Sequence, residues 1–474
     1  MSVEDKVYHF KSLYQTSSPW FKRISGRLYS ILPMSIRYGK TFKITLEFLN
    51  KSQWWSREQF ENWQLEQLKK LIRHAYENVP YYKHTFDQNR ITPEDIKTLE
   101  DFRKISFVTR ENIKKNLNDF VAINYKNKII PFTTGGSTGE PLKIYWEKGR
   151  TRPLEKAFMW RQWNWVNFNI GDKTAVLRGF LIKKSWWYYD PIDKALVLSA
   201  YHLKGENIPH YIQKLREFQP VSIQAYPSVL TILAKYMKNK NTSPINSIKV
   251  ILCGSENLFP YQRKLFEEVF QCRVFSWYGQ GENVCLAANC EFSNNYHIFS
   301  EYGFTELIDE EGNPVEEEDE RGEIVSTGFN NYALPLIRYR TGDIGVMTKD
   351  QCNCRRCYSL LKRIDGRKQD YIVTSDGRLI SATALIFGQH FDAFSRIERM
   401  QLVQVQKGDV TVKIVKYPDY ARKDEEEIRA KMIDCVGSNL RINFSYVEQF
   451  HLTRRGKHIF VIQKLPIDSL WTSK

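Results

Sequence analysis

The sequence lacks the patterns that carry a chain into or across a membrane. No run of eighteen apolar residues occurs, so we expect no transmembrane helix. The opening residues, MSVEDKVYHF, include acidic side chains where a secretory signal would be basic. We therefore expect a cytoplasmic protein. The first fifty residues carry eight Lys/Arg against three Asp/Glu, which leaves open peripheral contact with the inner face of a membrane.

Blocks of like charge, internal repeats and low-complexity segments are also missing, apart from one acidic run, EEEDE. The net charge is +16, from 70 basic and 54 acidic residues, and no five or six basic residues stand together. The total would suit a polyanionic partner, but dispersed charge is typical of a solvated surface. Nucleic acid is therefore not the partner we expect.

Cysteine is sparse and unevenly spaced, with eight residues, of which three crowd into CNCRRC. In a reducing compartment such a cluster favours a metal site over disulfides. We expect Cys253, Cys272 and Cys435 to be ordinary buried thiols.

The 474 residues are too many for one core, so we expect two or three domains, and 42% hydrophobic with 26% charged residues indicates a globular chain. Residues 51–90 show helical spacing of apolar side chains, a capping box at Ser56 and Gln59, and Pro80 at the end of the pattern. Short β-rich runs then alternate with helical runs up to about residue 300. This alternation predicts an α/β fold with a wound sheet.

Strand patterns dominate after residue 300, beginning with a hairpin around the acidic turn. The last region reads as strands around one helix, a small α+β domain. We place the boundary near residues 364–370. The predicted domains are 1–366, with an N-terminal helical segment 1–120, and 367–474.

One segment, TTGGSTGEP, combines glycines with hydroxyl side chains between two strand-like runs. It has no Gly-Lys-Ser/Thr and leads into no helix, so it is not a Walker loop. Glycines let a backbone approach a ligand, and hydroxyls with exposed amides bind phosphate oxygens. A hairpin turn is the alternative, but it needs only two residues. We interpret residues 133–139 as a phosphate-binding loop.

Further segments follow in a characteristic order. They are YPSVL, ILCGSENL, WYGQGE, LPLIRYRTGDIG, RIDGR and RRGKHIFVI, preceded by LKKLIRHAYENVPYYKHTF and ITPEDIKTLEDFRKISFVTRENI. With the glycine-rich loop, they make nearly the whole chain resemble the adenylate-forming enzymes. Within these, the sequence is most similar to the phenylacetate–coenzyme A ligase family and its capsule-biosynthesis branch, called CapK. The resemblance implies the adenylate-forming (ANL-type) fold, with a large α/β domain and a small mobile C-terminal domain.

The resemblance also implies roles for particular residues in an ATP-dependent, AMP-forming ligation that requires Mg²⁺. Glu282 would hold Mg²⁺, Arg367 would lie near the ribose and phosphate, and Lys457 would bridge the substrate carboxylate and the α-phosphate. Asp343 would accept the ribose hydroxyls. The remaining nucleotide contacts would come from Thr133, Thr134, Gly135, Gly136, Ser137, Thr138 and Gly139 at the phosphates, and from Gly254, Ser255, Glu256, Tyr278 and Gly279 at the adenine.

Two positions depart from the family pattern. Gly281 replaces the usual Thr or Ser before the glutamate, which removes a hydroxyl near the phosphates. Gln369 replaces the aspartate at the hinge about which the small domain rotates between half-reactions, with Asp370 one residue later.

Relatives also carry a Cys/His set whose counterparts here are Cys290, His297, Cys352 and Cys354. Three thiolates and an imidazole suit a closed structural zinc site, in which Cys357 could replace one ligand and Cys285 is a more remote candidate.

The acyl pocket would be partly aromatic, drawing on Tyr226 and the many tryptophans of residues 160–168 and 186–187, although such side chains are more often core. The acceptor of the acyl group stays open between coenzyme A, a sugar hydroxyl or amine, and a carrier thiol.

Two other interpretations of the function remain. One is a non-catalytic basic module that binds an anionic glycan or nucleic acid, and the other is an adenylyl transferase that stops at the AMP adduct.

Overall fold

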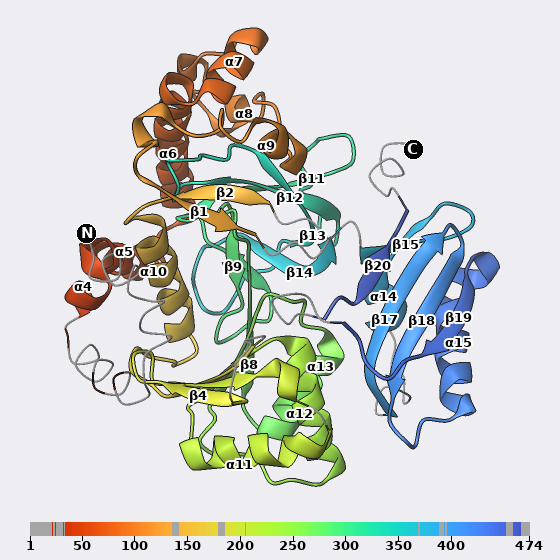
Figure 1. Ribbon diagram of the computed structural model, residues 1–474. Helices are drawn as coiled ribbons and strands as arrows, with labels where there is room; N and C mark the ends of the chain where they lie inside the picture. The colour runs from red at the N-terminus through yellow and green to blue at the C-terminus, as the bar shows by residue number, and fades with distance from the viewer. Residues whose placement is uncertain are drawn as a thin grey trace.

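The computed structural model describes residues 34–134, 142–178, 185–203, 205–367, 370–387, 396–451 and 458–465, together with residues 21, 24, 32 and 393. A large body holds the chain up to β14, and the last strands and helices form a smaller body beside it (Figure 1). Within the described part of the chain, no helix is long and apolar enough to cross a membrane.

The N-terminal region is helical. Its elements are α4 (Met34–Arg37), α5 (Gly39–Ser52), α6 (Arg57–Asn78), α7 (Pro80–Asn89), η1 (Pro93–Asp95), α8 (Leu99–Phe102), α9 (Arg110–Asn116) and η2 (Ile123–Tyr125). The capping box at Ser56 is confirmed, since its hydroxyl accepts from the Gln59 amide and the Gln59 side chain accepts from the Ser56 amide. Pro80 separates two helices by starting α7, because its fixed φ suits a first helical turn.

A sheet of twelve strands forms the centre of the large body, in the order β11-β12-β13-β14-β10-β9-β8-β7-β6-β3-β5-β4. Strands β8, β7, β6, β3 and β5 run parallel, and the others pair antiparallel. The bounds are β3 (Thr174–Arg178), β4 (Trp187–Asp190), β5 (Ala195–Ser199), β6 (Ser222–Ala225), β7 (Val250–Cys253), β8 (Arg273–Gly279), β9 (Leu286–Ala288), β10 (Tyr296–Ile298), β11 (Gly303–Ile308), β12 (Arg321–Gly328), β13 (Tyr339–Thr348) and β14 (Leu360–Arg367). The predicted α/β class is confirmed, and β8 joins the parallel and antiparallel parts.

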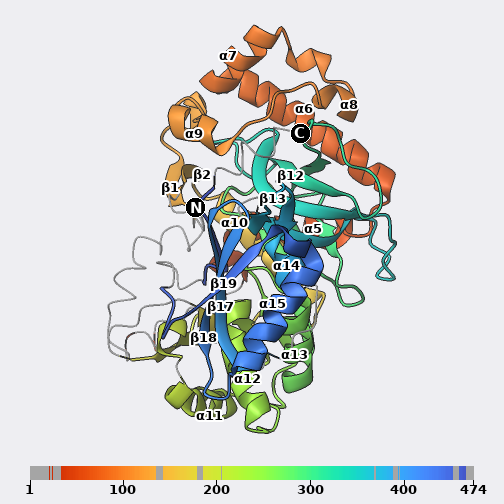
Figure 2. The ribbon, with the colours of Figure 1, turned by 90° about the vertical axis from the view of Figure 1, so that its right-hand side faces the viewer.

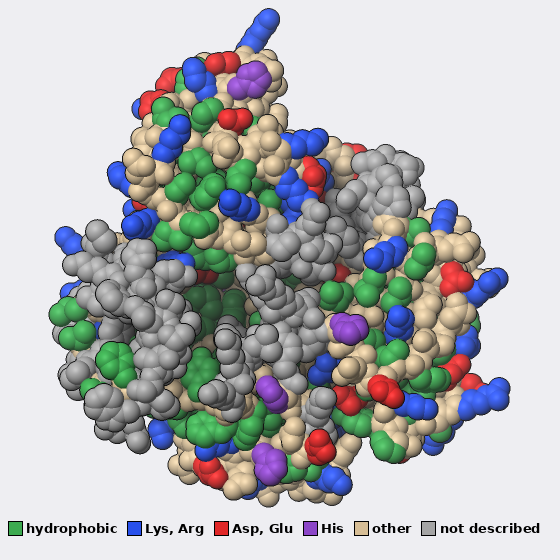
Figure 3. All heavy atoms as spheres, viewed as in Figure 1, with side chains coloured by type: hydrophobic (Ala, Val, Ile, Leu, Met, Phe, Trp, Pro, Cys, Tyr) green, Lys and Arg blue, Asp and Glu red, His purple; other side chains and the backbone are tan. Residues whose placement is uncertain are grey.

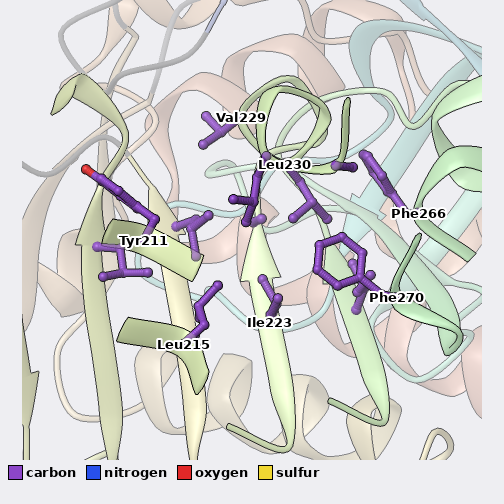
Figure 4. Packing of buried hydrophobic residues seen from close by; sticks show 14 of the residues in the cluster. Tyr211, Leu215, Ile223, Val229, Leu230, Phe266 and Phe270 are labelled. Atoms are coloured by element: carbon purple, nitrogen blue, oxygen red, sulfur yellow. The ribbon is translucent and has the colours of Figure 1, made fainter. Parts of the chain in front are cut away.

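Helices cover the sheet and build its cores. They are α10 (Thr151–Asn164), α11 (Ile208–Phe218), α12 (Pro227–Asn239) and α13 (Pro260–Phe270), with turns η3 (Ala200–His202) and η4 (Gly205–Asn207). Figure 4 shows one core, in which Tyr211 and Leu215 of α11 and Phe266 of α13 pack over Ile223 of β6. The apolar residues of these helical runs form the faces that are buried here.

Strands β1 (Ile129–Thr133) and β2 (Lys143–Glu147) form a separate antiparallel hairpin, with Thr133 opposite Lys143. The predicted phosphate loop connects them, and its residues 135–141 lie outside the described part of the chain. The base of the loop is fixed by Thr134 and Leu142. The Thr134 amide donates to the Leu142 carbonyl at 2.9 Å, and the Leu142 amide donates to the Thr134 hydroxyl at 3.1 Å.

The smaller body has its own core, made by residues from Ile372 to Val461. Its strands are β15 (Tyr371–Val373), β16 (Leu379–Ser381), β17 (Ile397–Gln406), β18 (Asp409–Lys416), β19 (Arg441–Tyr446) and β20 (Val461–Gln463), with η7 (Gly437–Asn439). The expectation of one helix was wrong, because α14 (Ala382–Phe387) packs with α15 (Arg422–Val436) (Figure 2). The six apolar-rich residues of α14 are too few for a helical period to be visible in the sequence.

Candidate functional site

Three adjacent parallel strands end at the same edge of the sheet, and a motif follows each. Tyr226 follows β6, Gly254 follows β7, and Glu282 comes three residues after the end of β8. The carboxyl edge of parallel strands is where α/β sheets bind ligands. Strands β13 and β14 bring Asp343 and Arg367 to the same place as cross-strand neighbours.

Asp343 is the centre of a small polar network. The Tyr278 hydroxyl donates to its Oδ2 at 2.7 Å, and Arg367 Nε lies 3.3 Å from its Oδ1. Gln280 in turn donates to the Tyr278 hydroxyl at 3.0 Å. Burial raises the pKa of Asp343, whereas the Arg367 charge and the Tyr278 hydrogen bond lower it. The sequence placed Tyr278 at the adenine, and the structure adds that its hydroxyl fixes the predicted ribose carboxylate.

Glu282 is 8% exposed and shares this electrostatic environment. Burial is the main cause that raises the pKa of its carboxyl, while Arg367 and Arg110 lower it. A buried carboxylate close to cationic side chains is a suitable oxygen ligand for Mg²⁺ accompanied by phosphates. The chemistry of this position therefore fits the predicted metal.

Arg110 was not identified from the sequence. The segment before it is held on β13, because the Val108 amide donates to the Arg338 carbonyl at 3.0 Å and the Arg340 amide donates to the Val108 carbonyl at 2.9 Å. This pairing places α9, which begins at Arg110, beside the strand that carries Asp343. A contact between residues more than two hundred positions apart leaves no local signal in the chain.

Gly281, the departure from the family pattern, has a packing reason. A Cβ at this position would lie 2.5 Å from Phe132 Cε1, so the ring of Phe132 occupies the space of a side chain. Phe132 stacks on Trp146 with ring centroids 3.8 Å apart, and Trp146 Nε1 donates to the Gly281 carbonyl at 3.0 Å. A Thr or Ser here would displace the aromatic pair.

Gly254, Ser255 and Glu256, which the family resemblance predicts at the adenine, follow β7, and Gly254 lies against the Trp277 indole, which comes within 2.5 Å of where a Gly254 Cβ would be. The Glu256 carboxylate accepts from the Ser228 amide at 3.0 Å, from the Ser228 hydroxyl at 3.1 Å and from the His458 amide at 3.3 Å. It therefore joins the loop after β7 to the start of α12 and to the small body. Lys457, directly before His458, lies outside the described residues, as do Gln369 and Gly135–Gly139.

Most of the aromatic side chains suggested for the acyl pocket belong to cores. Trp160, Trp165 and Phe168 are buried in one cluster, and Trp186 and Trp187 pack on another. Trp163 is partly buried and meets Trp277 edge to face, with ring centroids 6.2 Å apart. Trp163 therefore packs against a side chain of β8.

A second site lies on the antiparallel part of the sheet. Cys290 follows β9, His297 is in β10, and Cys352 and Cys354 lie between β13 and β14. Their ligand atoms all lie within 4.8 Å of one another. This is the predicted set, and the Cys357 side chain is exposed outside it. Cys285 is buried elsewhere, beside Thr305 and Ser326.

The local contacts suit a zinc ion. The Cys290 Sγ accepts from the amides of Phe292 and Ser293, each at 3.3 Å, and lies 3.4 Å from Cys352 Sγ. His297 Nε2 lies 3.2 Å from Cys354 Sγ. The Cys290 contact lowers the pKa of Cys354, and although burial alone lowers the pKa of His297, the Cys352 and Cys354 thiols raise it to about 9. Thiolates and one imidazole are the donors of a closed structural zinc site.

Comparison with known proteins identifies relatives of this chain. The family described as the CapK C-terminal domain matches residues 372–464. The protein CapK of Staphylococcus aureus is 25% identical over 411 residues, which cover 85% of this chain and 89% of CapK. The phenylacetate–coenzyme A ligase of Escherichia coli K12 is 25% identical over 327 residues, covering 65% of this chain and 71% of the ligase. The chain is a homologue of CapK and of the phenylacetate–coenzyme A ligases.

Solved structures show the same fold. 2-Hydroxyisobutyryl-CoA ligase in its postadenylation state aligns with a TM-score of 0.69 at 18% identity, covering 90% of this chain and 96% of the ligase. The same ligase in its thioesterification state aligns with a TM-score of 0.59. This chain therefore has the fold of the adenylate-forming CoA ligases.

Proposed function

We propose that this protein is an ATP-dependent, AMP-forming ligase that activates a carboxylic acid and transfers the acyl group to an acceptor. The observation that carries the proposal is the convergence of Tyr278, Glu282, Asp343 and Arg367 at the carboxyl end of β8. Homology to the phenylacetate–coenzyme A ligases supports the reaction type.

In the first half-reaction, a carboxylate oxygen of the acid attacks the α-phosphorus of ATP. The bond from this phosphorus to the oxygen bridging the β-phosphate breaks, and pyrophosphate leaves. In the second, the acceptor atom attacks the acyl carbon, loses its proton and releases AMP. Catalysis of such transfers depends mainly on positioning and charge neutralisation.

Different side chains position the nucleotide and neutralise its phosphate charge. Asp343, fixed by Tyr278 and Arg367, accepts the ribose hydroxyls, and Arg110 and Arg367 neutralise phosphate charge. Glu282 holds Mg²⁺, which supplies further neutralisation at the phosphates. Residues Thr133 to Gly139 bind the terminal phosphates, and Lys457 bridges the substrate carboxylate and the α-phosphate. The loop assignment follows from its glycines and hydroxyls together with the family resemblance, and the Lys457 assignment follows from the resemblance.

The acceptor is a thiol such as that of coenzyme A, or an amine or hydroxyl on a sugar. Similarity to CapK over 85% of the chain supports a place in capsule or surface polysaccharide synthesis. On the face seen in Figure 3, Lys and Arg side chains are spread among acidic ones without forming one patch. This distribution does not favour the alternative of a basic binding module.

The Cys290, His297, Cys352 and Cys354 cluster holds structural Zn²⁺.

The test is pyrophosphate release with ATP, Mg²⁺ and hydroxylamine across aryl, fatty, amino and uronic acids, beside Lys457→Ala. Hydroxylamine captures an activated acyl group whatever the natural acceptor is. Release with one class of acid, lost in the lysine variant, establishes adenylation and names the substrate class. Folded protein that binds no ATP would contradict the ligase and favour the binding module. Activation without transfer to any acceptor offered would favour the adenylyl transferase.

A further inference from the structure

The residues on both sides of Glu282 are tethered to other elements. Gly281 and Asn283 flank the glutamate in the segment between β8 and β9. Each is held by a side chain from a different element, so the direction of the Glu282 carboxylate depends on both contacts.

The first tether comes from the β1–β2 hairpin. Trp146 Nε1 of β2 donates to the Gly281 carbonyl at 3.0 Å, and Phe132 of β1 stacks on the same indole. Because Gly281 has no Cβ, the Phe132 ring can lie against its backbone. The strands that contribute these rings are the two that flank the predicted phosphate loop.

The second tether comes from α10. Asn283 has φ +57°, a left-handed conformation that a residue with a side chain adopts at some cost. The side-chain Nδ2 of Asn283 donates to Glu155 Oε2 at 3.2 Å and to the Tyr302 hydroxyl at 2.9 Å. The Tyr302 hydroxyl in turn donates to Glu155 Oε2 at 2.6 Å. Glu155 therefore accepts both hydrogen bonds on one oxygen.

Close backbone packing completes the second side. A Cβ on Gly328 would lie 2.3 Å from the Asn283 carbonyl oxygen, and one on Gly303 would lie 2.4 Å from the Val284 carbonyl oxygen. The chain after Glu282 thus lies directly on two glycines of β11 and β12. Side chains there would push the loop, and Glu282 with it, out of place.

We propose that Trp146 and Glu155 are positioning residues for the Glu282 carboxylate. They hold the two neighbouring residues so that the carboxylate keeps its place in the electrostatic environment that it shares with Arg367 and Arg110. Trp146 also belongs to the β1–β2 hairpin, so the strands that flank the predicted phosphate loop are linked to the segment that carries Glu282. This inference rests on the proposed function.

The experiment measures the dissociation constant of ATP by calorimetry, with Mg²⁺ and with EDTA. In the wild type, Mg²⁺ should tighten binding. Trp146→Phe keeps the stacked ring but loses the indole N–H, and Glu155→Ala loses the acceptor. Trp146→Phe should reduce the Mg²⁺-dependent gain roughly five- to tenfold, as expected for one lost hydrogen bond, and Glu155→Ala, which removes the acceptor of two hydrogen bonds, should reduce it at least as much. Both variants should leave the EDTA value unchanged. Glu155→Gln keeps an acceptor oxygen and should restore most of the gain.

Matched controls are Trp187→Phe on β4 and Glu61→Gln on the outer face of α6. Variants that keep the wild-type gain would overturn the positioning role, as would a loss of affinity that is equal with and without Mg²⁺. ATP binding that is indifferent to Mg²⁺ in the wild type would also overturn it, while leaving the ligase open to the hydroxylamine test. A wild type that binds no ATP contradicts the proposed function itself. If one variant fails to fold, the other decides.

Discussion

Asp343 is held by two partners from different strands, the Tyr278 hydroxyl on β8 and the Arg367 guanidinium on β14. Asp343→Asn keeps the size and one acceptor oxygen but removes the charge. We expect kcat/KM for ATP to fall roughly ten- to hundredfold, the range for a lost charge-assisted hydrogen bond. Steady-state pyrophosphate release checks this, with Asp309→Asn in the β11–β12 hairpin as the control. Equal losses in both variants would contradict the ribose role.

Arg110 is the residue whose role the structure adds. Its charge lowers the pKa of Glu282, so the two groups share one electrostatic environment. We expect Arg110→Met to raise KM for ATP about tenfold, since a cation facing the phosphates would be lost. Lys115→Met, in the last turn of the same helix and exposed, is the control and should leave KM unchanged. An Arg110 variant with wild-type KM would separate this residue from the nucleotide.

Among single residues, the sequence predicts the functional ones that stand in short, recognisable motifs. Glu282 stands in the turn after β8 and Asp343 in a Thr-Gly-Asp motif that lies within β13, and in both places a single carboxylate is visible against glycines. Arg110 and Glu155 sit in ordinary helical runs, and only pairing with β13 or packing against Asn283 gives them a role. Gly281 was visible as a departure, but its reason, the Phe132 ring, lies 149 positions earlier in the chain.

The connection between β13 and β14 depends on the cysteine cluster. It meets the β9–β10 region through the Ile298 amide, which donates to the Ser359 carbonyl at 2.9 Å, and through side chains such as those of Cys290 and Cys352, and metal ligation there would add a further link between the two segments. We expect the purified protein to contain about one equivalent of zinc, the number one tetrahedral site holds. Cys352→Ser should lose the metal and lower the melting temperature by roughly 10 °C, as a loss of several kcal/mol would.

Metal analysis and a thermal melt check this prediction. Cys357→Ser is a matched control, because that cysteine is exposed and outside the cluster. Identical metal content and melting temperature in Cys352→Ser and the wild type would mean that the cluster is a set of free thiols.

Elements were predictable where local signals agree. Helices α12 and α13 each begin with a proline and bury a clear apolar face, so the sequence gives their bounds directly. Strands β4 and β5 and helix α14 were not identified. Their apolar runs of four to six residues are too short to distinguish strand from helix without the neighbouring strands.

The two bodies of the molecule meet through α12, α13 and the loop after β7. Lys235 of α12 is buried and donates to the Ile397 carbonyl at the start of β17, and Phe259 contacts Phe460 with ring centroids 5.7 Å apart. Burial lowers the pKa of Lys235 to about 7, although Glu398 raises it. Contact between the bodies therefore favours the neutral form of this amine.

The sign follows from the two states. Separation of the bodies would expose Lys235 and return its pKa toward the ordinary value near 10.5. Between pH 7 and about 10 the separated state then binds more protons, so docking strengthens as the pH rises and is weakest below pH 7. We expect the radius of gyration from small-angle scattering to decrease from pH 6.5 to pH 9.5, and Lys235→Met to abolish the change. Lys238→Met, exposed on the same helix, is the control, and a pH response that survives Lys235→Met would refute the prediction.

The Glu256 carboxylate offers a way to observe these movements. It binds the Ser228 amide on the large body and the His458 amide on the small one. An amide proton is sensitive to the electron density of its acceptor, and that density changes when a second donor leaves the same carboxylate. Selective ¹⁵N labelling of serine would make the Ser228 resonance, at the start of α12, a spectroscopic reporter of docking. The position of the small body could then be followed during turnover without a dye or a cross-link.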